Sequence, residues 1–187
     1  MSLLFLKSFF KRPHQVASVI PSFPMLVERV ARHFDFSEPR RIIELGPGEG
    51  VHTRALLERL PAGSSLLLIE IDADLAAHLK AAFADDERVE VVQAEANELA
   101  AEMQKRGWEH CDYVLSGIPF SILPADKKKP LIESIYAALK PEAHSAFVIY
   151  QVTPELRDHA AMFPRHESKY CLWNLPPMFV IAFFKTP

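Results

Sequence analysis

The alternation of strand-like and helix-like segments between residues 41 and 151 constrains the fold of this chain more than any other feature. Short apolar runs of strand length are separated there by segments with helical spacing, a pattern typical of a parallel sheet with helices on both faces. Beyond residue 151, two further strand-like runs are joined by a short Asn-Leu-Pro-Pro connection, which predicts an antiparallel pair at one edge. The sequence therefore predicts an α/β fold with a mostly parallel seven-stranded sheet, with strands at residues 41–45, 65–70, 88–93, 111–116, 143–151, 168–173 and 178–184.

Local end signals place helices between these strands. The helix after residue 50 ends at Pro61, and the next one, over residues 73–83, has Asp72 as its predicted N-cap. A third helix over residues 97–106 stops at Gly107, and a short helix over residues 154–163 leads into the antiparallel pair. We also expect an N-terminal helical segment at residues 1–38, ahead of a core at residues 39–187.

Length and composition fit one folded domain. A chain of 187 residues buries about two-thirds of its unfolded surface. Its content of 49% hydrophobic and 24% charged residues is ordinary globular usage and argues against disorder. The net charge of -3 supplies no general attraction for a phosphate backbone, which argues against nucleic acid as a partner. We therefore expect a single domain over residues 1–187.

The sequence gives no support to a membrane-spanning, secreted or metal-binding protein. The apolar stretch at residues 178–184 is far shorter than the about 20 residues of a membrane-spanning helix. Residues 1–12 make a poor signal peptide because Lys7 interrupts their apolar residues and no small-residue cleavage pattern follows. Cys111 and Cys171 belong to no zinc-binding spacing, so no metal site is expected. We expect a cytoplasmic protein.

The segment Ile-Ile-Glu-Leu-Gly-Pro-Gly-Glu-Gly at residues 42–50 places three glycines between a predicted strand and a predicted helix. A dinucleotide-binding fold uses G-x-G-x-x-G, in which the helix N-terminus holds a pyrophosphate, but Val51 stands at the last glycine position here. Gly46 and Gly48 still allow a tight turn and a close approach of a ligand to the backbone. The pattern therefore favours a nucleoside without phosphates, and the alternative is a tight turn without a ligand.

Two further candidate elements follow at the ends of the next two strands. Ligands of open α/β sheets bind beyond the carboxyl ends of the strands, so Glu70 is placed to accept the hydroxyls of a ribose. For Glu70 alone, a solvated strand end is an equally good interpretation. Gln93-Ala94-Glu95-Ala96 ends the third strand, where a polar side chain and a backbone amide could bind an adenine edge.

The glycine turn, ribose acid and adenine loop, in this order, resemble the class I (Rossmann-like) family of S-adenosylmethionine-dependent methyltransferases over about residues 40–185. The resemblance implies a methyltransferase that binds S-adenosylmethionine and releases S-adenosylhomocysteine. It implies that Glu44 and the glycines surround the methionine part, Glu70 the ribose and Glu95-Ala96 the adenine. Many family members have Asp where Glu95 stands. The residues expected to bind the cofactor are Glu44, Gly46, Pro47, Gly48, Gly50, Glu70, Ile71, Glu95, Ala96 and Ser116.

The methyl acceptor is expected beyond the fourth strand, at Ser116-Gly117-Ile118-Pro119-Phe120. Adenine N6 methyltransferases, including ribosomal RNA adenine dimethylases, carry an Asn-x-Pro-aromatic motif there, and this chain lacks the asparagine. The segment is similar instead to the Ser-Gly-Leu-Pro signature of bacterial phospholipid N-methyltransferases, as are residues 9–16 with Pro21-Ser22 and residues 174–177. Phe23 departs from that family, where a second serine is usual. The resemblance implies a phospholipid amine, such as phosphatidylethanolamine, as substrate.

Other readings of the acceptor remain open, including an RNA adenine or small-molecule methyltransferase and a catalytically silent cofactor-binding protein. We expect Ser116, Pro119, Phe120 and Tyr150 to line the acceptor pocket. Phe120 or Tyr150 could face an ammonium through its π cloud. A general base is not identified; the candidates are Tyr150, His144 and His166.

The first residues of the chain form an amphipathic pattern. On a helical wheel, Phe5, Leu6, Phe9 and Phe10 share an arc with Leu3, and Lys7, Ser8, Lys11 and Arg12 share the opposite one; Leu4 does not fit. Residues 2–12 therefore either make a peripheral membrane contact or pack on the domain as an ordinary core helix.

Overall fold

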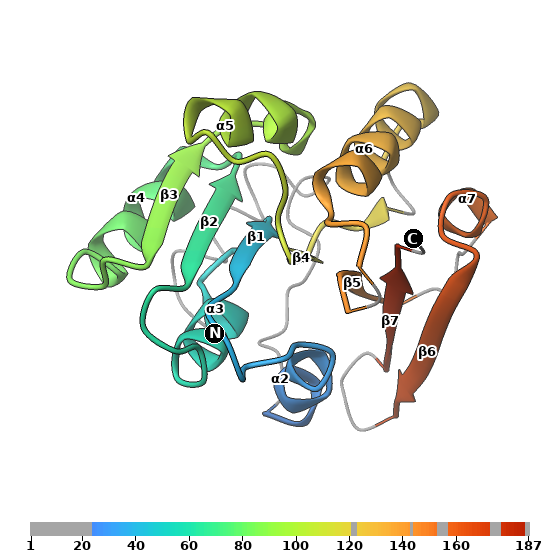
Figure 1. The fold of residues 1–187 in the computed structure, drawn as a ribbon, viewed down its shortest axis with the longest axis horizontal. Coiled ribbons are helices and arrows are strands. Elements are labelled where there is room, and N and C mark those ends of the chain that lie inside the picture. The colour runs from blue at the N-terminus through green and yellow to red at the C-terminus, as the bar shows by residue number, and fades with distance from the viewer. Residues whose placement is uncertain (1–23, 121–122, 143, 153–156, 173–176, 186–187) are drawn as a thin grey trace.

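The computed structural model describes residues 24–120, 123–142, 144–152, 157–172 and 177–185. Seven strands form one sheet in the order β3-β2-β1-β4-β5-β7-β6 (Figure 1). The strands are β1 (Arg41–Leu45), β2 (Ser65–Glu70), β3 (Val89–Gln93), β4 (Tyr113–Ser116), β5 (Ala146–Gln151), β6 (Arg165–Cys171) and β7 (Met178–Phe184). The neighbouring strands β1 to β5 are parallel, and β7 runs antiparallel to both β5 and β6. This confirms the predicted sheet and its antiparallel edge.

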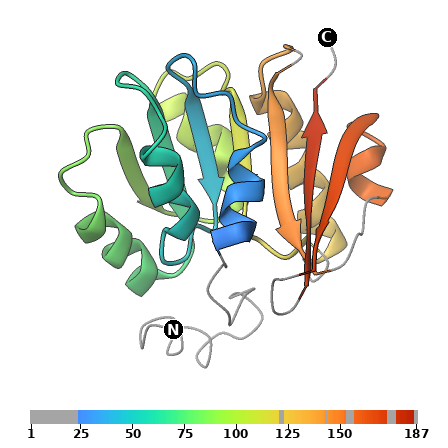
Figure 2. The ribbon, with the colours of Figure 1, turned by 90° about the horizontal axis from the view of Figure 1, so that it is seen from below.

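The helices cover both faces of the sheet. Figure 2 shows α2, α3 and α4 in front of the strands, with α5 and α6 behind them. Their bounds are α2 (Pro24–Ala31), α3 (Val51–Leu57), α4 (Ala73–Ala82), α5 (Leu99–Lys105), α6 (Ala125–Ala138) and α7 (Arg157–Ala160), with a short 3₁₀ helix, η1 (Ala96–Glu98), before α5. Among the described residues, no helix is long and apolar enough to cross a membrane.

The central strands are continuous apolar runs because both of their faces are buried. Alternate residues of β1 illustrate this, since Ile42 packs in the core beneath α2, α3 and α4 and Ile43 packs in the core beneath α5 and α6. The predicted cap of α4 is also confirmed, because the carboxylate of Asp72 accepts hydrogen bonds from the backbone N–H groups of Asp74 and Leu75. Burial and capping therefore explain why this part of the fold was predictable.

Several predicted bounds were wrong. The strand expected at residues 111–116 begins at Tyr113, because Cys111 makes only an isolated bridge to Leu139. The strand expected at residues 168–173 runs from Arg165 to Cys171; six of its seven residues are exposed, so it lacks the apolar pattern that marks a strand. The helix expected at residues 154–163 is described only at Arg157–Ala160. Residues 1–23, which include the amphipathic segment, and residues 173–176 lie outside the described residues.

Candidate active site

The glycine turn lies at the carboxyl edge of the sheet, between the ends of β2 and β4. Gly46 and Gly48 have φ angles of 66° and 59°, a region that glycine adopts without strain. The N–H of Gly46 donates to the carbonyl of Ile69 at 2.9 Å, and the N–H of Gly117 donates to the carbonyl of Leu45 at 2.9 Å. These bonds join the turn to both neighbouring strands. A Cβ added at Gly48 would meet nothing within 4 Å, so the turn is open on that side.

Gly50 has a packing role that the sequence did not indicate. Its φ is 74°, and a Cβ there would lie 2.9 Å from the Phe83 ring and 3.0 Å from Leu79. Its N–H donates to the carbonyl of Pro47 at 3.0 Å. Gly50 therefore lets the start of α3 pack closely on the end of α4.

The carboxylate of Glu70 is folded onto the glycine turn. One oxygen accepts the N–H of Gly48 at 3.1 Å and the other accepts the N–H of Asp72 at 3.0 Å. Burial raises the pKa of Glu70, and these two hydrogen bonds offset part of that rise. Because a carboxylate has about four acceptor positions, both oxygens retain capacity for a further donor such as a ribose hydroxyl.

Glu44 lies on β1, on the inner side of the same edge. Its carboxylate accepts a hydrogen bond of 2.6 Å from the hydroxyl of Thr53, in the first turn of α3. Burial raises its pKa to about 7, and the charge of Glu70 adds to that rise. Among the residues that the structure describes, neither Glu44 nor Glu70 forms an ion pair with a lysine or an arginine. Two buried carboxylates without a cation fit a positively charged ligand, and they would repel a pyrophosphate.

The Tyr150 hydroxyl lies where the loop after β1 meets the loop after β4. A Cβ at Gly117 would lie 2.5 Å from the Tyr150 hydroxyl and 2.7 Å from the carbonyl oxygen of Gly46. Only a glycine at residue 117 therefore lets the hydroxyl take this position. Burial, followed by the charges of Glu44 and Glu70, raises the pKa of Tyr150, so the hydroxyl stays protonated.

His52 packs against the Tyr150 ring, with 4.5 Å between the ring centroids. Burial lowers the pKa of His52 to about 4, so its imidazole is neutral at physiological pH. His52 and Thr53 were not predicted from the sequence, and Gly117 was predicted only as part of a motif. Their position in the first turn after a glycine loop was the only signal that could have drawn attention to the two α3 residues.

The other predicted acceptor residues are less open than expected. The Ser116 hydroxyl is buried and accepts the N–H of Ile118 at 3.1 Å, so it shapes the loop after β4. Phe120 is only 2% exposed, and its ring contacts those of Phe147 and His159 in the interior. Whether Phe120 also faces an acceptor stays a prediction, since its observed contacts are those of a core residue.

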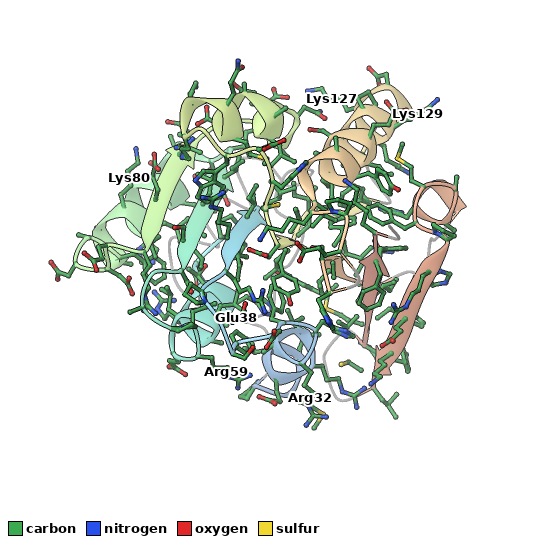
Figure 3. All side chains as sticks on the ribbon, in the orientation of Figure 1. Arg32, Glu38, Arg59, Lys80, Lys127 and Lys129 are labelled. Carbon is green, nitrogen blue, oxygen red and sulfur yellow. The ribbon has the colours of Figure 1, made fainter. Side chains whose placement is uncertain are left out.

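The adenine loop is built by η1. Glu95 caps this helix in a reciprocal arrangement with Glu98, and its carboxylate also pairs with Lys127 at 2.8 Å. Lys127 belongs to the exposed start of α6 (Figure 3). The Glu95 side chain is therefore already engaged on the surface, which leaves the backbone near Ala96 as the simpler partner for an adenine edge.

His144 and His166, two of the candidate general bases, lie at the edge of the sheet opposite the glycine turn. His144 precedes β5, whose carboxyl end carries Tyr150. His166 pairs with Phe183, and Phe183 pairs with Phe147 near the start of β5. The structure therefore removes both histidines as candidate bases for a reaction at the glycine turn.

The fold matches solved methyltransferases over nearly its whole length. One is the N-methyltransferase NodS from Bradyrhizobium japonicum, with a TM-score of 0.70 and 10% sequence identity, covering 96% of this chain and 98% of that protein. The fold and the site together define a class I, S-adenosylmethionine-dependent methyltransferase. More particularly, the chain belongs to the ribosomal RNA adenine dimethylase family, whose model matches residues 23–157.

Relatives by sequence carry two different acceptor names. The ornithine lipid N-methyltransferase of Singulisphaera acidiphila is 32% identical over 138 residues, which cover 74% of this chain and 72% of that protein. The ribosomal RNA small subunit methyltransferase A of Thermosynechococcus vestitus is 29% identical over 126 residues, 66% of this chain. The match spans only 42% of that RNA methyltransferase.

Proposed function

We propose that this enzyme transfers a methyl group from S-adenosylmethionine to the amine of a phospholipid, such as phosphatidylethanolamine or a related lipid amine. The observation that carries the proposal is the contact between Gly117 and Tyr150. In the Asn-x-Pro-aromatic motif of adenine N6 methyltransferases, the asparagine falls at residue 117. With Tyr150 in its present position, even a Cβ at residue 117 would be 2.5 Å from the hydroxyl. The amide that would bind an adenine amine therefore has no room.

The likeness to a lipid methyltransferase supports the same choice. The match to the ornithine lipid enzyme spans most of both chains, whereas the RNA methyltransferase match spans less than half of its relative. The RNA acceptor is retained as the second candidate because the family model is described by that activity. The RNA candidate would use an asparagine amide at residue 117, and the lipid candidate would not. Assays with both acceptors therefore separate the two candidates.

The cofactor-binding roles follow from charge and position. The glycine turn and Glu44 are assigned to the methionine part, where the cationic ammonium group would compensate the buried carboxylate. Glu70 is assigned to the ribose and the backbone near Ala96 to the adenine. When bound, the cofactor supplies an electrophilic methyl group on a sulfonium, whose positive charge disappears as the methyl leaves.

Little acid–base chemistry is then required of the protein. A neutral amine attacks with its lone pair, and the methylated ammonium product releases a proton to solvent. Because the Tyr150 hydroxyl remains protonated, its role is to orient the amine through a hydrogen bond rather than to remove a proton. The ring can also face the ammonium product. Positioning in a site shielded from water supplies the remaining rate enhancement.

The test measures transfer of a labelled methyl group to phosphatidylethanolamine in detergent micelles, to ribosomal RNA and to free ethanolamine. We expect label in the lipid alone, and a lower kcat for Tyr150→Phe with little change in cofactor affinity. Tyr136→Phe is the matched control, because Tyr136 packs against Phe163 in the core beneath α6. Label in RNA but not in lipid would reverse the ranking of the two acceptors.

A further inference from the structure

Exposed apolar side chains gather at one edge of the molecule. Among the residues that the structure describes, four large apolar side chains are exposed: Met25 (45%), Val152 (50%), Tyr170 (47%) and Leu172 (61%). Isolated exposed apolar residues are common, but a group of them on one edge indicates a contact surface. We call these four residues the apolar rim.

Strand register places the rim at the edge that carries the active site. Phe179 of β7 pairs with both Gln151 and Tyr170, so β5 and β6 end at the same level. Val152 and Leu172 each follow one of these ends directly. Strand β5 is also parallel to β4 and β1, whose carboxyl ends carry the glycine turn. At about 3.3 Å per residue, Val152 lies roughly 7 Å beyond Tyr150 along β5.

The start of α2 completes this edge. Figure 2 shows α2 beginning on the side where β1 and β5 end. One turn into the helix, the guanidinium of Arg29 donates to the carbonyl of Tyr170 at 2.9 Å, which fixes α2 to the end of β6. Met25 is one turn before Arg29, so it extends the rim towards the face covered by α2.

The flank beside the rim is basic, although the whole chain has a net charge of -3. The segment from Pro24 to Arg32 and strand β6 together carry four cationic and two acidic side chains. One of the acids, Glu28, is shared by Arg32 at 3.4 Å and Arg59 at 2.6 Å, and both arginines lie on the outer side of the α2 and α3 layer (Figure 3). Arg165 begins β6 level with the start of β5, at the opposite edge, and Arg32 follows the far end of α2, so the basic flank beside the rim consists of Arg29 and Lys169.

We propose that the apolar rim and its basic flank dock the folded domain on the surface of an anionic phospholipid bilayer, with the active-site edge towards the lipid. The apolar side chains would enter the interface, and the cations would face the acidic headgroups. The inference rests on the proposed lipid substrate, since docking at this edge brings the amine of a bilayer lipid to Tyr150. It is separate from any contact made by residues 2–12.

Binding of the full-length protein to vesicles of equal parts phosphatidylethanolamine and phosphatidylglycerol tests the proposal. We expect the double variant Val152→Ser/Leu172→Ser and the single variant Lys169→Glu each to bind about five- to twenty-fold more weakly than wild type. Lys80→Glu makes the same charge change on an exposed position of α4, far from the rim (Figure 3), and should bind within about twofold of wild type.

The outcomes separate this inference from the proposed function. Methyl transfer to phosphatidylethanolamine in detergent micelles should be unchanged in all three variants, because none alters the site. Loss of that activity in wild type would overturn the lipid substrate itself. Equal weakening by Lys169→Glu and Lys80→Glu, or wild-type binding by the rim variants, would overturn the docking surface. If the rim variant altered the sedimentation velocity of the protein but not its binding to vesicles, the rim would instead be a contact surface for a second copy of the chain.

Discussion

Replacing Gly117 by alanine tests the contact on which the choice of acceptor depends. The new Cβ would lie 2.5 Å from the Tyr150 hydroxyl and 2.7 Å from the Gly46 carbonyl oxygen. Tyr150 is packed against His52, and the carbonyl belongs to the backbone, so neither can retreat without cost. Overpacking of this kind costs about 1–3 kcal/mol. At about 2–4 °C for each kcal/mol, the midpoint of thermal unfolding should fall by roughly 2–12 °C.

A double-mutant cycle with Tyr150→Phe isolates the part due to the hydroxyl. Removing that oxygen relieves the 2.5 Å contact. The new Cβ would still lie 3.3 Å from the ring carbon that carried the hydroxyl and 2.7 Å from the Gly46 carbonyl oxygen. The double variant should therefore be about 0.5–2 kcal/mol more stable than the sum of the single changes predicts, measured by denaturant unfolding. Gly107→Ala is the control, because Gly107 has a φ of 64° with open space around its Cβ position and should not couple to Tyr150. Additivity of Gly117→Ala and Tyr150→Phe within about 0.4 kcal/mol would refute the reasoning.

Four further predictions concern the carboxylates, His52 and the N-terminus. The folded protein holds the Glu44 proton up to about pH 7, whereas the unfolded chain releases it above about pH 4.5. The contribution of Glu44 to the free energy of unfolding therefore falls by about 3 kcal/mol as the pH rises between those values. Glu44→Gln should remove this fall, measured as the pH dependence of the unfolding midpoint. His52 acts in the opposite sense: its contribution is present above pH 6.5 and is lost as pH falls towards 4, so His52→Gln should be less sensitive to acid than wild type. Glu70→Gln should raise the calorimetric Kd for S-adenosylmethionine about 5- to 150-fold, and an unchanged Kd would remove Glu70 from the site. Deleting residues 1–12 should lower vesicle co-sedimentation without lowering the unfolding midpoint, whereas equal sedimentation would favour packing of this segment on the domain.

The parts of the fold that were predictable are those where local sequence and burial agree. Strand β1 is apolar in its buried part except at Glu44, because helices cover both sides of it, and Asp72 caps α4 by a contact within three residues. Strand β6 was misplaced because its position depends on pairing with β7, while its side chains face solvent. Edge strands carry little of the periodic signal from which strands are recognised.

The site divides in the same way. The positions of the glycine turn and of Glu70 beside it were predictable because backbone conformation and strand ends determine them, and their roles towards a ligand stay predictions. The contact between Gly117 and Tyr150 was not predictable, because it joins the ends of two strands and depends on how a ring is oriented by His52. Phe120 was expected to line a pocket because of its loop position; its ring packs inside the core, and its contact with an acceptor stays a prediction.

The charges of the molecule assign a direction to a lipid substrate under the proposed function. Glu44 and Glu70 make the inner end of the site negative, which favours the amine end of a zwitterionic headgroup and repels its phosphate. The flank carrying Arg29 and Lys169 lies at the outer edge, outside the site, and makes that side of the molecule positive. An acceptor with its phosphate inward would meet the opposite arrangement of charge at both ends, and this disfavours a polyanionic RNA strand more than a single lipid headgroup.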